Sequence, residues 1–266
     1  MDDYCPKRGF LGEHGLSLHI ETPASKILLD TGQTDAFIAN AELMGIDLSS
    51  LNAVILSHGH YDHGGGLEAL YKRLSACPPP FFAGRDFDAP RSVKQGDQLK
   101  DIGLPSRGLS SHLPVPILID VLERFDKNAC IIPSAEAIDV TGTSAPFLII
   151  KSGIEKLDTF ADELSLVFDE GDGIVIVTGC AHRGILNITY AAMKVFPGKP
   201  IKALVGGFHL VDKAESELAK ISEAIAALEP EAVFCAHCTS PRGFSALLNS
   251  MPGKVKWLTC GMNVSI

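Results

Sequence analysis

The chain has 266 residues, 46% of them hydrophobic, and its 23 basic and 32 acidic side chains give a net charge of −9 at pH 7. Proteins that hold nucleic acid usually have a basic surface, so this charge argues against a nucleic-acid partner. No apolar stretch approaches the roughly 20 residues of a membrane span, which argues against a membrane protein.

The N-terminal third predicts a hairpin, a helix and a buried strand, in that order. The apolar runs LSLHIET (16–22) and KILLDTG (26–32) are joined by a turn-like TPAS and predict a β-hairpin. Helical spacing of apolar residues predicts a helix over 34–45. The β-branched run Ala53–Leu56 predicts a short buried strand, and a further helix is expected over 64–74.

The middle of the chain, from Cys77 to about Phe160, has a looser pattern. It is rich in Pro, Gly and charged residues, which predicts loops around a few short strands such as VPILIDVL (115–122). Segments of this kind between ordered halves often form the cover of a site. We therefore expect one domain over 1–266, with an insertion at about 77–160 that covers its site.

The C-terminal part predicts a regular alternation of strands and helices. LSLVFDEGDGIVIVTG (164–179) indicates a tight hairpin across EGDG. The elements expected after it are a helix at 185–196, a strand at 201–207, a helix at 213–228, a strand at 231–236, a helix at 241–251 and a last strand from 254. Hairpins followed by such an alternation predict a mixed α/β protein with helices over sheet faces.

Four potential metal ligands follow the buried strand within six positions: His58, His60, Asp62 and His63. Imidazole and carboxylate groups are the usual protein ligands of zinc and similar divalent ions. Side chains two positions apart on an extended segment point the same way, so His58 and His60 can share one metal ion. Asp62 and His63 can then serve a second ion nearby.

Three further histidines, His182, His209 and His237, each follow an apolar run and a small residue, and Asp30 also ends a predicted strand. A lone histidine after a strand is a core or surface residue about three times in four. Four strand-end occurrences, one of them a dense cluster, favour instead an open site for two metal ions.

These motifs resemble those of the metallo-β-lactamase superfamily. SHGHYDH resembles its H-x-H-x-D-H motif, and LLDTG resembles its first acidic motif. The chain resembles the branch of 7,8-dihydropterin-6-methyl-4-(β-D-ribofuranosyl)aminobenzene-5'-phosphate synthases, through EHGLSLHIE, LSHGHYDHGGGL, DELSLVF, TGCAHRGILNI, GGFHL and HCTS. The resemblance implies an αββα sandwich whose metal ions lie at one edge of two central sheets. Electron carriers of the superfamily have a carboxylate where His60 stands, so histidine there implies a hydrolase-like zinc site.

The chain departs from the superfamily pattern in two places. No histidine occurs in KLDTFADEL before the second hairpin, and the bridging aspartate position is occupied by Cys180. His182 is the third ligand of one metal ion, or Cys180 binds, or neither ion has a full ligand set; we favour His182. In addition, either the first edge strand of the fold is missing, or the chain begins at the very end of that strand. An edge left unpaired could be completed by another chain, so an oligomer is one expectation.

The resulting hypothesis is a dinuclear, metal-dependent hydrolase-like enzyme that acts on a phosphorylated or anionic small molecule. The branch implies a pterin-related synthase of methanopterin-like biosynthesis. The expected cofactor is one or two Zn²⁺ per chain, with Mn²⁺ or Fe²⁺ as alternatives. A metal-containing sensor or binding module without turnover is a second hypothesis, and a nuclease of the same fold is a third, disfavoured by the acidic charge.

The expected roles follow from the ligand pattern and the resemblance. The first metal ion takes His58, His60 and His182, and the second takes Asp62, His63 and His237. His209 is the candidate proton donor or oxyanion stabiliser, Asp62 is a further catalytic candidate, and Asp30 orients a ligand. Arg183 is a candidate phosphate contact, although an exposed arginine is the commoner outcome.

The cysteines indicate the compartment rather than the chemistry. The seven cysteines are irregularly spaced and do not form a disulfide framework, and the segment after Met1 has no secretory pattern. We therefore expect reduced thiols in the cytoplasm. Cys235 is expected to pack in its strand, whereas Cys238 either packs or lies near the site.

Overall fold

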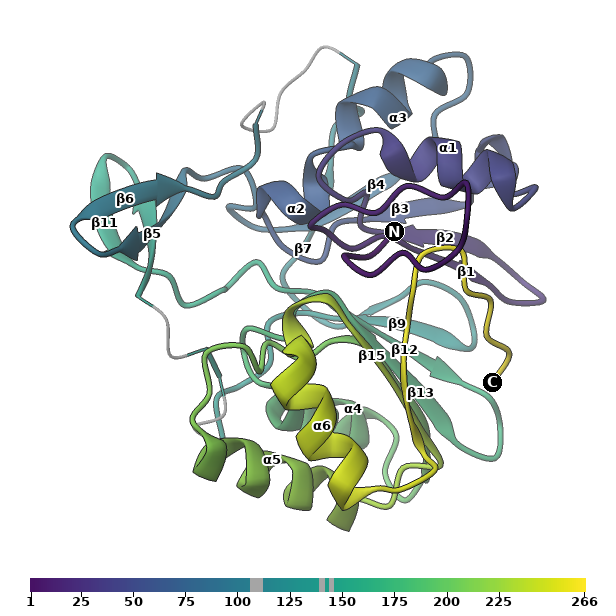
Figure 1. The fold of residues 1–266 in the computed structure, drawn as a ribbon. Coiled ribbons are helices and arrows are strands. Elements are labelled where there is room, and N and C mark those ends of the chain that lie inside the picture. Colours follow the sequence, from purple (N-terminus) through teal and green to yellow (C-terminus); the bar gives the residue numbers. More distant parts are fainter. Residues whose placement is uncertain (106–111, 139–141, 144–145) are drawn as a thin grey trace. The chain divides into compact units, whose positions relative to one another are not determined.

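The chain divides into two compact units. The computed structural model describes residues 1–105, 112–138, 142–143 and 146–266. Unit 1 comprises Met1–Asp120, Ala145–Asp162 and Thr259–Gly261, and unit 2 comprises Val121–Ser144, Glu163–Leu258 and Met262–Ile266. Figure 1 labels their helices and strands.

Unit 1 contains a five-stranded sheet in the order β1-β2-β3-β4-β7. Its strands are β1 (Leu18–Glu21), β2 (Lys26–Leu29), β3 (Ala53–Ile55), β4 (Phe81–Gly84) and β7 (Ile117–Ile119). The antiparallel pairing of β1 with β2 confirms the predicted hairpin, and the remaining neighbours are parallel. β1 is an edge strand, and the described residues before it contain no strand.

Helices of unit 1 pack on this sheet through an apolar cluster. The helices are α1 (Ala36–Leu43), α2 (Tyr61–Gly64) and α3 (Leu67–Arg73), with the 3-10 helix η1 (Leu48–Ser50). Phe37 of α1 and Leu70 of α3 belong to one buried cluster with Val54 of β3 and Phe81 of β4. The strand β3 is wholly buried, so the segment that follows it starts from a rigid support.

The segment 77–160 is richer in strands than its composition predicts. Its described part contains β4 to β11, although 106–111, 139–141 and 144–145 lie outside the described residues. Four of these strands form an antiparallel sheet of unit 1 in the order β11-β10-β5-β6. They are β5 (Arg91–Gln95), β6 (Gln98–Asp101), β10 (Phe147–Lys151) and β11 (Ile154–Leu157). Both edge strands are exposed along their length, which explains why no apolar pattern marked them.

Unit 2 is built on a seven-stranded sheet in the order β16-β15-β14-β13-β12-β9-β8. The strands are β8 (Glu123–Arg124), β9 (Ala129–Ile132), β12 (Ser165–Asp169), β13 (Ile174–Thr178), β14 (Ile201–Gly207), β15 (Ala232–Ala236) and β16 (Val255–Trp257). The hairpin β12–β13 is antiparallel as predicted, and β13 to β16 are parallel.

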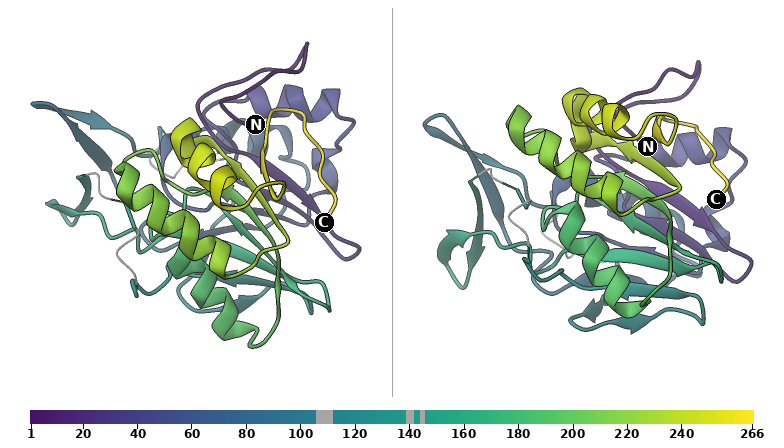
Figure 2. Two further views of the ribbon diagram at one scale, coloured as in Figure 1. Left: turned by 60° about the horizontal axis from the view of Figure 1, so that its bottom comes forward. Right: turned by 90° about the horizontal axis from the view of Figure 1, so that it is seen from below.

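Three helices connect the parallel strands of unit 2. They are α4 (Ile185–Val195), α5 (Glu215–Ala227) and α6 (Ser240–Ser250), and the 3-10 helix η2 (His237–Thr239) precedes α6. Consecutive right-handed crossovers place such helices on the same face of a sheet. Accordingly α5 packs against both α4 and α6, as Figure 2 shows in two views. The carboxyl ends of β13, β14 and β15 therefore meet at one edge of this sheet.

None of the helices in the described residues is long and apolar enough to cross a membrane.

Candidate metal centre

The histidine motif of unit 1 forms a buried cluster directly after β3. His58 and His63 are 0% exposed, and His60 is 5% exposed. The ring centroid of His58 lies 4.5 Å from that of His60 and 4.3 Å from that of His63. The structure thus brings three of the predicted ligands together around His58, with the buried carboxylate of Asp62 one residue before His63.

Asp30 fixes the orientation of two of these rings. Its Oδ2 accepts hydrogen bonds from His63 Nδ1 at 2.6 Å and from Ser57 Oγ at 2.7 Å, and its Oδ1 accepts from Ser57 N at 2.7 Å. Ser57 Oγ also lies 2.9 Å from His58 Nδ1. Because the hydroxyl proton goes to Asp30, the oxygen accepts from His58 Nδ1. Both imidazoles then carry their proton on Nδ1 and present Nε2 as a lone-pair donor.

The protonation state of His58 suits a metal ligand. Burial, followed by the neighbouring His63 and His60, holds the pKa of His58 well below its usual value of 6.5. The ring is therefore neutral near pH 7, which is the form that binds divalent cations. This donor chemistry fits Zn²⁺ and related ions without rearrangement of the hydrogen bonds to Asp30.

Asp62 has a neighbour that the sequence analysis did not single out. His14 Nε2 lies 3.2 Å from Asp62 Oδ2, and His14 Nδ1 lies 2.8 Å from Asp3 Oδ2. His14 precedes the first hairpin and does not end a strand, so the strand-end criterion could not find it. Its occurrence in the stretch EHGLSLHIE was the available signal.

A second cluster lies at the carboxyl edge of the sheet in unit 2. Cys180 and His182 follow β13, His209 follows β14 and His237 follows β15. The strand of His209 lies between the other two, as predicted. The φ angles of His209 and His237 are +43° and +52°. Such left-handed conformations cost energy in non-glycine residues and concentrate at functional sites.

The donor atoms of this cluster form two overlapping groups. The Sγ atom of Cys180 and one ring nitrogen each of His182 and His209 lie within 4.8 Å of one another, and Cys180, His237 and Cys238 form a second such group. Cys180 belongs to both groups, and His182 lies beside it in the first. Both candidates for the third metal ligand are therefore close to the other donor atoms of the cluster. Thiol and imidazole donors together suit Zn²⁺ better than Mn²⁺.

Cys238 is suited to the thiolate form. Burial acts to raise its pKa, but hydrogen bonds involving Cys180 and His209, together with the nearby imidazoles, outweigh burial and hold the pKa well below its usual value of 9.0. The backbone N–H of His209 donates to Cys238 Sγ at 3.3 Å. A thiolate is the form in which cysteine binds metal.

Glu163 supports the turn of Cys180 and His182 and was missed by the sequence analysis. Its buried carboxylate accepts from His182 N at 2.6 Å and from Arg183 N at 2.9 Å. The partly buried Arg183 donates from Nε to the carbonyl of Ala135 at 2.8 Å, and its predicted contact with phosphate stays a prediction. The spacing of a buried acid that accepts from backbone N–H groups gives no signal, and the occurrence of Glu163 in the stretch DELSLVF was the available one.

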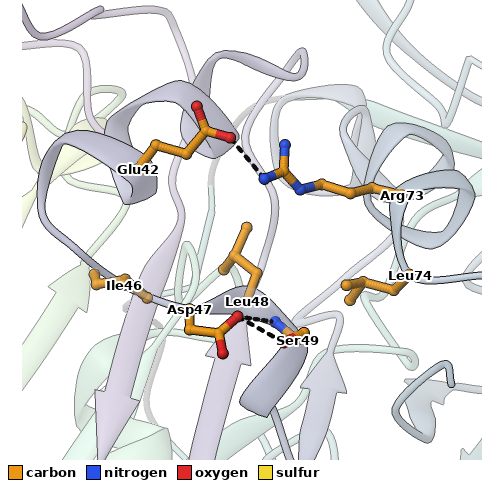
Figure 3. A pocket seen from close by; sticks show the side chains of 7 residues that line it. All are labelled: Glu42, Ile46, Asp47, Leu48, Ser49, Arg73 and Leu74. Atoms are coloured by element: carbon orange, nitrogen blue, oxygen red, sulfur yellow. Dashed lines mark hydrogen bonds and ion pairs between the residues drawn. The ribbon is translucent and has the colours of Figure 1, made fainter.

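A hollow of about 280 Å³ in unit 1 has a different lining from the histidine cluster. Figure 3 shows its side chains, among them the ion pair between Glu42 and Arg73 and the hydrogen bonds of Asp47 to Ser49. It contains no histidine or cysteine, so it offers no imidazole or thiol donor for a metal ion.

Comparisons with known proteins identify the family of this chain. The family model of the metallo-β-lactamase superfamily matches residues 12–81. A crystal structure of Tm1679, a metal-dependent hydrolase of the β-lactamase superfamily, is 30% identical with a TM-score of 0.87, covering 100% of this chain and 96% of that chain.

Two proteins of Methanocaldococcus jannaschii are also similar. A 7,8-dihydropterin-6-methyl-4-(β-D-ribofuranosyl)-aminobenzene-5'-phosphate synthase is 28% identical over 253 residues, which is 89% of this chain and 83% of the relative. An uncharacterized protein is 27% identical over 254 residues, which is 92% of this chain and 90% of that protein.

Proposed function

Because the chain belongs to the metallo-β-lactamase superfamily, we propose that it is a metal-dependent, hydrolase-like enzyme with two metal ions that acts on a phosphorylated or anionic small molecule. The observation that carries the proposal is the buried triplet of imidazoles around His58. Asp30 holds the ring of His63 directly and that of His58 through Ser57, with Nε2 presented, an arrangement typical of metal-ligating histidines.

The proposed ligands are those that the sequence predicts: His58, His60, Asp62 and His63 of unit 1, and His182 and His237 of unit 2. Divalent cations held there would polarise an electrophilic substrate group and lower the pKa of a water molecule or substrate group. We propose His209 as a proton donor, because its ring centroid lies 4.2 Å from that of His182 and it follows the strand between the other two. Zn²⁺ is the proposed metal, supported by the thiols beside the imidazoles.

The substrate class is inferred from the relatives. One is named for a reaction that forms a pterin-containing 5'-phosphate, and another is a metal-dependent hydrolase. Both kinds of chemistry develop negative charge on the reacting group, which a metal site stabilises. We therefore propose a phosphorylated substrate, with a pterin-related synthase as the specific form of this activity.

The test is a metal analysis of purified protein combined with turnover. We expect close to two equivalents of Zn²⁺ per chain, and we expect His58→Ala and His237→Ala each to lower that content. His112→Ala is the control, because His112 is exposed and belongs to neither cluster. A His58→Ala protein with full metal content and full activity would refute the proposal.

Turnover separates the enzyme from a binding module. With added Zn²⁺ or Mn²⁺ we expect hydrolysis of a generic phosphodiester or carboxylic ester, and loss of that activity in His58→Ala and His209→Ala. Tight binding of a phosphorylated pterin with no product from it or from the generic esters would overturn the enzymatic proposal in favour of a metal-containing sensor.

A further inference from the structure

A buried ion network in unit 1 contacts the histidine motif. Arg91, at the start of β5, has a side chain that is only 1% exposed. Its Nε donates to Asp158 Oδ2 at 2.8 Å, and its Nη2 pairs with Asp162 Oδ2 at 2.8 Å. The two carboxylates are equally buried, with 2% and 1% of their side chains exposed. Charges so fully removed from water persist only when they are paired and hydrogen-bonded.

The first connection from this network reaches the backbone between His58 and His60. The N–H of Gly59 donates to Asp162 Oδ2 at 2.8 Å, on the same oxygen that pairs with Arg91. Arg91 Nη1 donates to the carbonyl of Phe87 at 2.9 Å and approaches that of Gly59 at 3.5 Å.

The space around Gly59 is too small for any side chain. A Cβ added there would lie 1.7 Å from the carbonyl oxygen of Phe87 and 2.3 Å from Arg91 Nη1. The His–Gly–His turn therefore packs directly against both the guanidinium of Arg91 and the carbonyl of Phe87, to which that guanidinium is hydrogen-bonded. A shift of either group would displace the turn.

The second connection reaches the ring of His60. Asp158 accepts Arg91 on Oδ2 and the backbone N–H of Phe160 on Oδ1, at 2.8 Å each. Phe160 is held at φ +52°. Its ring packs edge-on against that of His60 with centroids 5.7 Å apart, and Phe147 packs on His60 at 5.6 Å. Asp158 thus fixes the position of Phe160, against whose ring the ring of His60 packs.

One connection from this guanidinium therefore reaches the backbone between His58 and His60, and the other reaches the ring of His60. We infer that Arg91, Asp158 and Asp162 are positioning residues that hold His60 and its turn in the geometry for metal binding; this inference rests on the proposed function. Ligand geometry must be held to within about 0.5 Å, and supporting residues of this kind typically change metal affinity 10–100-fold.

Arg91→Lys tests the inference while retaining the positive charge. A lysine ammonium lacks the planar fork that bridges two carboxylates and four backbone carbonyls, so the turn loses part of its support. The matched control is Arg85→Lys, which alters an exposed ion pair with Asp120 in the same unit. Should Arg91→Lys fail to fold, Asp158→Asn removes the carboxylate that joins Arg91 to the backbone of Phe160, while the hydrogen bond from Gly59 to Asp162 stays in place.

The readouts are Co²⁺ affinity, by competition with a chromophoric chelator, and the visible absorption spectrum of the Co²⁺ protein. We expect about 10-fold weaker binding or more in Arg91→Lys, with a changed spectrum, and neither effect in Arg85→Lys. A lower melting temperature with unchanged affinity and spectrum would overturn the inference, because the network would then only stabilise unit 1. Wild-type protein that binds no metal would overturn the proposed function itself, and with it this inference.

Discussion

Asp30→Asn is the most informative single substitution in the histidine cluster. Asp30 is fully buried and accepts three hydrogen bonds, from Ser57 N, Ser57 Oγ and His63 Nδ1. Asparagine has the same shape and tolerates the φ of +61° at this position, so the backbone is not newly strained. The asparagine amide, however, has only one accepting oxygen. When that oxygen accepts from Ser57 N, the NH₂ group faces Ser57 Oγ and His63 Nδ1.

That NH₂ group favours the tautomer of His63 with its proton on Nε2, the atom proposed to bind metal. Binding must then reverse the tautomer against the new hydrogen bond. We expect the metal dissociation constant to rise 10–100-fold, which corresponds to about 1.4–2.7 kcal/mol. The assay is competition with a chromophoric chelator at fixed pH, on protein shown to be folded by circular dichroism.

The control for this prediction is Asp47→Asn. Asp47 also accepts from the backbone N–H and the hydroxyl of one serine, Ser49, at 2.9 and 2.6 Å, but it is exposed and contacts no histidine. We expect its metal affinity to equal that of the wild type. Folded Asp30→Asn protein whose dissociation constant stays within about twofold of wild type would refute the reasoning about the tautomer.

Two further predictions concern stability. Burial lowers the pKa of His58 from 6.5 in the folded protein, so below pH 6.5 the unfolded state binds more protons than the folded state. The free energy of unfolding of the metal-free protein should therefore fall with acidification, by up to about 1.4 kcal/mol per pH unit. Urea denaturation at several pH values should show this slope reduced in His58→Gln, and equal slopes would contradict it. In Glu163→Gln, one of the backbone N–H groups of His182 and Arg183 faces the amide NH₂ group, which cannot accept a hydrogen bond. We therefore expect a loss of about 1–3 kcal/mol in the free energy of unfolding. Stability unchanged within error would show that these two hydrogen bonds contribute nothing measurable.

The fold was predictable where the pattern is local. The hairpin β12–β13 and the helix α5 follow from apolar periodicity over a few residues, and both occur as expected. The four-stranded sheet was not, because β6 and β11 are exposed and polar, and β5 pairs with β10 across the chain, with Ser92 opposite Leu148.

In the candidate site, too, only the residues with a local sequence pattern were predictable. His58, His60 and His63 could be identified because their spacing follows one buried strand. Arg91 and Glu163 could not be identified from spacing, because each is hydrogen-bonded to backbone groups of a distant part of the sequence. Charged side chains of these types are also usually exposed.

The hydrogen bond from Gly59 to Asp162 spans 103 positions of the chain. During synthesis the histidine turn leaves the ribosome long before the carboxylate that supports it, so the nascent chain carries exposed imidazoles without their scaffold. Contacts of such long separation in sequence form late and slowly. Under the proposed function, loading of a metal ion is therefore expected to follow release of most of the polypeptide, and mutations near Asp162 should lower the yield of loaded protein even where the metal is plentiful.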